Sequence, residues 1–188
     1  MTELVFTAFD VQKYLQEALP ALRAAIYRGD LSQTKDVLAL YDEPLYDESD
    51  LTESLIEVDH SWIFTESAAN PEAMDPAGDI VSLTYPLILL YHHPELFQIE
   101  VSKLELDSVL DPSELAIQPG FREGLRAMWE IVGFVTPETT KAFQQYCSST
   151  GRAKAAQRSE ETVRVIEEMA DGLRLVVERG LGLVVERE

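Results

Sequence analysis

Lysine and arginine are missing from a long stretch of this 188-residue chain. Between Asp36 and Ser102 there is no basic residue, whereas the same window contains fifteen aspartates and glutamates. The whole chain has 34 acidic and 15 basic residues, a formal net charge of −19, so this window carries most of the imbalance. Such a charge repels phosphate groups. Neither nucleic acid nor an anionic membrane surface is therefore expected as the main partner.

Cysteine is nearly absent as well. Cys147 stands alone, which excludes an internal disulfide framework and a four-thiolate zinc site. It lies four residues after Phe143, on the same stripe of a predicted helix, and we expect a small core residue there instead of a nucleophile. A single reduced thiol suits a cytoplasmic protein.

Long hydrophobic runs are also lacking. The most apolar stretch, Ile80–Tyr91, has 12 residues, against the roughly 20 that a membrane-spanning helix needs. It is typical of a buried core segment, helix or strand, with Pro86 favouring helix. The opening MTELVFTAFD has Glu3 and Asp10 where a secretory peptide has basic residues, so we expect a cytoplasmic location and no membrane partner.

The composition is otherwise that of a globular protein, with 46% hydrophobic and 26% charged residues. The length favours one domain. We predict a single α+β domain over residues 1–188, rich in helix, with a small antiparallel sheet that includes a C-terminal hairpin.

Helical spacing of apolar residues marks the first half of the chain. A helix is predicted from Val11 to Ile26, kinked or divided at Pro20. A short second helix follows Ser32, and residues 51–64 suit a third.

Helix signals are stronger in the second half. Apolar spacing predicts a helix from Phe121 to Val132 that ends at Gly133. Thr136-Pro137-Glu138 predicts the start of the next helix, which runs to about Ser149. A flexible, solvated linker is expected at 150–158. Ser159 then begins a helix that Asp171-Gly172 is expected to close.

Two segments are typical of strands. Residues 97–101 alternate apolar and polar side chains, with Leu104 and Leu106 extending the pattern. The pentapeptide LVVER occurs at Leu175–Arg179 and again at Leu183–Arg187, which predicts a hairpin about the glycines between the copies. A helix ending at Gly180 is the alternative. The free edge of such a hairpin would allow a homodimer.

The acidic window supplies the leading functional hypothesis, a protein-binding module of inhibitor, immunity or regulatory type that engages a basic partner. Electrostatic steering by the window would speed that encounter. The expected contact is a loop in which tyrosines alternate with acids, since aromatic anchors inside a polar rim provide affinity. Its candidate binding residues are Tyr41, Asp42, Glu43, Tyr46, Asp47, Glu48 and Asp50.

The alternative hypothesis is a metal-assisted hydrolase. All three histidines, His60, His92 and His93, lie in the acidic window, with Asp59 and Glu95 beside them. Imidazole and carboxylate together suit zinc, iron or manganese. No metal-binding spacing motif accompanies them, so core packing of the histidines is favoured. We therefore expect a binding protein without a cofactor in preference to an enzyme.

Overall fold

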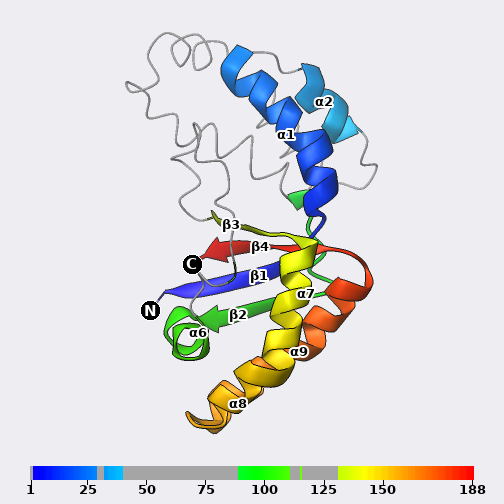
Figure 1. Ribbon diagram of the computed structural model, residues 1–188. Helices are drawn as coiled ribbons and strands as arrows, with labels where there is room; N and C mark the ends of the chain where they lie inside the picture. Colours follow the sequence, from blue (N-terminus) through cyan, green and yellow to red (C-terminus); the bar gives the residue numbers. More distant parts are fainter. Residues whose placement is uncertain (1, 29–31, 40–88, 111–114, 116–130) are drawn as a thin grey trace. The chain divides into compact units, whose positions relative to one another are not determined.

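The computed structural model describes residues 2–28, 32–39, 89–110, 115 and 131–188 (Figure 1). The chain divides into two compact units. One comprises residues 1–11, 92–120 and 130–188, and the other residues 12–91 and 121–129.

The first unit contains an antiparallel sheet of four strands in the described residues. The strand order is β2-β1-β4-β3, so β1 and β4 are central. The strands are β1 (Glu3–Phe9), β2 (Gln98–Ser102), β3 (Ile131–Val135) and β4 (Gly182–Arg187).

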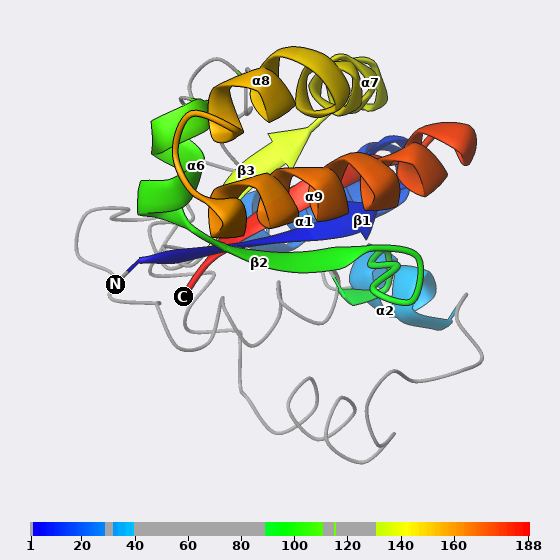
Figure 2. The ribbon, with the colours of Figure 1, turned by 90° about the horizontal axis from the view of Figure 1, so that it is seen from below.

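One face of this sheet is covered by helices from the second half of the chain. Both long helices, α7 and α9, lie on that face in the two views (Figures 1 and 2). The described residues of this unit form the helices α6 (Lys103–Val109), α7 (Pro137–Tyr146), the π-helical turn η2 (Cys147–Gly151), α8 (Arg152–Ala155) and α9 (Glu160–Glu178).

The core of this unit lies between the helices and the sheet. Strand β1 contributes Leu4, Phe6 and Ala8, all buried, and α9 presents a stripe of helical spacing that includes Met169 and Leu173. Full burial of a large apolar side chain contributes about 1.5–3 kcal/mol, so this layer contributes strongly to the unit's stability. The described part of the fold is thus α+β with an antiparallel sheet that includes a C-terminal strand, which confirms the predicted class.

The opposite face of the central strands is buried too. Val5, Thr7 and Phe9 of β1 alternate with the core residues and are all buried. The rings of Phe9 and Phe134 stack with centroids 5.7 Å apart. Because β1 is buried on both faces, its sequence shows a continuous apolar run without alternation. Such a run lacks the alternation by which a half-buried strand is identified from the sequence.

In the second unit, the structure has α1 (Val11–Arg28), with Pro20 inside it, and α2 (Ser32–Ala39). Both predicted helices are therefore present. The predicted helix at 51–64 lies outside the described residues, as does all but the end of the apolar stretch 80–91.

The two strongest helix starts are confirmed in atomic detail. The Thr139 N–H donates to Thr136 Oγ1 at 3.3 Å, and the Thr162 N–H donates to Ser159 Oγ at 3.0 Å. Each hydroxyl satisfies a backbone donor that has no partner within the helix. Local chemistry alone therefore set where α7 and α9 begin.

The expected end of the last helix was wrong, because α9 continues past Gly172 to Glu178. A Cβ placed on Gly172 would come within 2.2 Å of the Phe97 ring. Glycine at this position permits the close approach of α9 to the start of β2, and it does not terminate the helix.

The predicted C-terminal hairpin was also wrong. The first LVVER copy, Leu175–Arg179, forms the end of α9, and only the second copy is a strand. Gly180, with φ of 69°, ends the helix. The Gly180 and Leu181 N–H groups donate to Val177 O and Val176 O, an arrangement typical of helix C-termini. The alternative, a helix ending at Gly180, describes this region correctly.

Three further segments differ from expectation. The segment 150–158, expected as a linker, is helical through Ala155, which is fully buried in the core. The helix predicted from Phe121 lies outside the described residues up to residue 130, and its expected end at Gly133 falls within strand β3, Ile131–Val135. Leu104 and Leu106 lie in α6 and do not extend the strand. Strand β2 itself is confirmed.

Candidate functional site

The seven residues predicted to bind a partner, Tyr41, Asp42, Glu43, Tyr46, Asp47, Glu48 and Asp50, lie outside the described residues. Their role stays a prediction from the sequence. The structure does describe the charged side chains on the helices of the first unit, and their arrangement can be compared with the charge of the acidic window.

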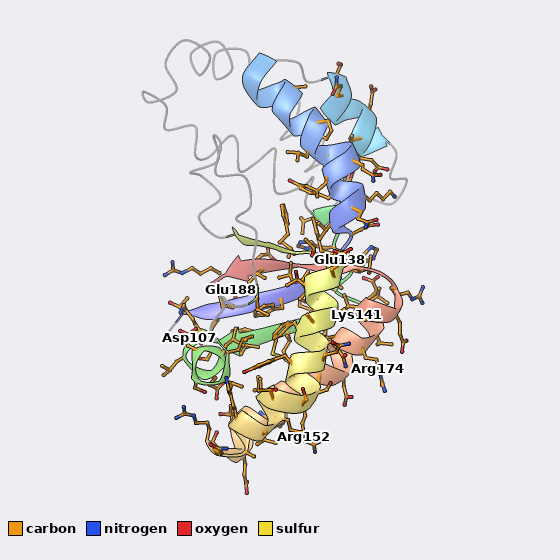
Figure 3. All side chains as sticks on the ribbon, in the orientation of Figure 1. Asp107, Glu138, Lys141, Arg152, Arg174 and Glu188 are labelled. Atoms are coloured by element: carbon orange, nitrogen blue, oxygen red, sulfur yellow. The ribbon has the colours of Figure 1, made fainter. Side chains whose placement is uncertain are left out.

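Charges of both signs are close together on the helical layer of the first unit. Figure 3 shows Glu138 and Lys141 projecting from the same helix, α7, and Arg174 from α9. Each helix therefore presents positive charge to solvent beside its acids.

Several of these charges form ion pairs. Arg152 contacts Glu167 at 2.6 Å, from α8 to α9. Lys103 pairs with Asp107 within α6, and Arg164 pairs with Glu161 within α9. All six side chains are more than one third exposed. Such pairs contribute about 0–1 kcal/mol each, so their main effect is to balance charge locally.

The two histidines within the described ranges, His92 and His93, lie in different environments. His92 is partly buried, its ring meets Phe9 edge-on with centroids 5.6 Å apart, and its Nε2 is buried without a hydrogen-bond partner. Burial, with a smaller effect of His93, lowers the pKa of His92 to about 4. His92 is therefore neutral at neutral pH.

His93 is more open to solvent. Its Nδ1 lies 3.2 Å from Glu95 Oε1, and both side chains are more than one third exposed. In the described ranges, no three His, Cys, Asp or Glu side chains are placed to hold a metal ion. His60 and Asp59 lie outside those ranges, so the metal hypothesis stays a prediction.

Two side chains on the second face of the sheet, Thr7 and His92, each have a polar atom that is buried without a hydrogen-bond partner. Thr7 is fully buried, and its Oγ1 has no hydrogen-bond partner. His92 lies opposite Phe9. Phe9 follows Thr7 by two residues and lies on the same face of β1. The signal that could have identified these two side chains is a lone threonine inside an apolar strand. Orphaned groups of this kind accept a buried water readily, and they do not by themselves indicate chemistry.

Cys147 is a core residue, as expected. It is 1% exposed, and burial raises the pKa of its thiol to about 12. A thiol held protonated in this way is a poor nucleophile. Tyr91, one of the aromatics in the acidic window, is also buried, and its hydroxyl donates to Glu17 Oε2 at 3.2 Å.

No α-helix in the described ranges combines the length and the apolar character needed to cross a membrane. Comparison of the chain with protein-family models, with curated proteins and with solved structures gives no match. The functional argument therefore depends on charge and geometry.

Proposed function

We propose that this protein is an acidic binding module that engages a basic protein partner, as an inhibitor, immunity or regulatory protein would. The observation that carries the proposal is the absence of any lysine or arginine between Asp36 and Ser102, where fifteen acids occur. No lysine or arginine in their own segment is present to neutralise those acids. A positively charged partner would provide that neutralisation and would be steered toward the window.

The helical layer provides the contrast that supports this proposal. There, acids are accompanied by bases in the same or the next helix, as in the Arg152–Glu167 and Lys103–Asp107 pairs. Solubility is served by a surface with charges of mixed sign. A segment without any base therefore favours a role in recognition over a role in solubility alone.

An equilibrium titration with polylysine at rising salt concentration tests the proposal. We expect affinity at low ionic strength that falls as salt is added, because exposed charges are screened. The variant D42N/E43Q/D47N/E48Q removes four charges from the predicted contact, and we expect it to bind several-fold more weakly.

A matched control removes the same number of charges elsewhere. E138Q/E168Q/D171N/E178Q changes exposed acids of α7 and α9, and we expect a smaller loss. An equal loss in both variants would mean that polylysine responds to net charge only, and no binding at low salt would refute the proposal.

A further inference from the structure

Within the described residues, the outer edge of β2 presents backbone N–H and C=O groups that could pair with a further strand. Ala8 N–H donates to Phe97 O at 2.9 Å, and Lys103 N–H donates to Thr2 O at 3.0 Å. Along an antiparallel ladder, every second residue pair exchanges backbone hydrogen bonds. Between these two bonds, the pairs Phe6–Ile99 and Leu4–Val101 are therefore hydrogen-bonded pairs as well.

The intervening residues of β2 therefore point the other way. The N–H and C=O groups of Gln98, Glu100 and Ser102 are directed away from β1. In the described part of the chain no strand pairs with this side, and β2 is the outermost strand of the sheet order. Figure 2 shows β2 in front of β1, at the edge of the sheet nearest to the viewer.

The side chains along this edge are accessible. Gln98 and Glu100 are exposed, whereas Ile99 and Val101 are buried on the face covered by helices. An added strand would thus meet a carboxylate on one face and the border of an apolar core on the other. By contrast, β4 is paired on both sides, so the C-terminal edge predicted from the sequence does not exist.

We propose that the outer edge of β2 takes up an extended segment of the basic partner as an additional antiparallel strand. The inference rests on the proposed function and specifies the partner's chemistry. Residues of the segment that share a face with Glu100 are lysine or arginine, and the alternate residues are apolar. Main-chain hydrogen bonds supply affinity in this mode of recognition, and alternate side chains supply specificity.

Charge decides between this occupant and a second copy of the chain. Pairing two β2 strands so that all three outward residues are used places Glu100 opposite Glu100. Like charges directly opposite destabilise a strand pair, and each copy carries a net charge of −19. A basic residue opposite Glu100 replaces that repulsion with attraction.

Amide hydrogen exchange, followed by NMR on the full chain, tests the inference with a peptide that alternates lysine and valine. Without peptide, we expect fast exchange at Gln98, Glu100 and Ser102, and slow exchange at Ile99 and Val101. With saturating peptide, the three outward amides become protected. If the peptide binds and these amides remain unprotected, the inference is wrong.

A pair of variants isolates the backbone contribution. Gln98→Pro removes one outward N–H at the first residue of the strand, where proline does not disturb the ladder to β1, and Gln98→Ala keeps it. We expect about a tenfold loss of affinity for proline and less than about twofold for alanine, with the Ile99 and Val101 amides still protected in both. Equal affinities of the two variants would overturn the inference.

The remaining outcomes separate this inference from the proposed function. A control peptide with its lysines and valines in two blocks has the same charge, and we expect it to bind without protecting the three amides. If neither peptide nor polylysine binds at low salt, both proposals fail. If only polylysine and the block peptide bind, only the β2 inference fails. Protection that rises with protein concentration in the absence of peptide would identify a second copy as the occupant and overturn it.

Discussion

The window Asp36–Ser102 and the following residues 103–188 contain the same number of acids, fifteen each. The second region also has eleven bases, whereas the first has none. Both regions are therefore equally rich in acids, and the window differs from the second region by its lack of lysine and arginine. Strands β3 and β4 and the helices α6 to α9 of the described fold lie in the second region, whereas β2 lies in the window. We therefore expect changes in the packed core of these elements to affect stability most, and we propose that the acids of the window act in recognition.

The largest effect is expected from a change in the core. Phe6 is fully buried between β1 and the helical layer, and its ring centroid lies 6.1 Å from that of Phe143. Phe6→Ala should lower the free energy of unfolding by about 3–5 kcal/mol, measured by urea denaturation. The variant D42N/E43Q/D47N/E48Q should change it by less than about 1 kcal/mol. A larger loss in the second variant would contradict this expectation.

A second prediction concerns His92, a residue of the acidic window that is partly buried against Phe9. Its pKa is about 4 when folded and about 6.5 when unfolded. The unfolded chain therefore binds a proton first as the pH falls, so His92 should cost up to about 2 kcal/mol of stability between about pH 7 and pH 5. His92→Gln should remove that loss. Parallel pH dependences of the two proteins in urea denaturation would refute the predicted burial.

A third prediction concerns the contact of α9 with β2. Gly172→Ala places a methyl group against the Phe97 ring, and overpacking of this kind costs about 1–3 kcal/mol, partly offset by the better helix propensity of alanine. We expect a net loss of about 1 kcal/mol in thermal or urea unfolding. A gain in stability would show that the two elements are not in close contact.

A fourth prediction, with an effect similar in size to that of Gly172→Ala, concerns a helix start. Ser159→Ala removes the acceptor for the Thr162 N–H and should cost about 1 kcal/mol. Ser149→Ala is a suitable control, because the Ser149 hydroxyl is exposed and donates only to Gln145 O within the helical turn. Equal stability of the two variants would mean that the cap adds nothing to α9.

The sequence allowed prediction where the signal is local. Thr136 and Ser159 identify helix starts because their hydroxyls bond to amides three residues away. Alternation at 97–101 identified β2 because only one of its faces is buried. In both cases the pattern can be recognised within a few neighbouring residues.

Prediction failed where distant packing decides. The pentapeptide LVVER is the end of α9 at Leu175–Arg179 and strand β4 at Leu183–Arg187. Identical residues thus adopt two structures, the first continuing an amphipathic helix and the second lying between β1 and β3. Likewise, whether a strand is central or at an edge depends on pairing across the chain, so the place of β2 at the edge of the described sheet could not be predicted from the sequence.

The central claim is that the window accelerates the encounter with a basic partner. Its most direct test is the association rate constant with a lysine-rich peptide at low salt, measured by stopped-flow fluorescence. We expect D42N/E43Q/D47N/E48Q to lower that rate constant about fivefold and E138Q/E168Q/D171N/E178Q to lower it by less than about twofold, with the difference lost at high salt. Equal rate constants for the two variants at low salt would contradict the account.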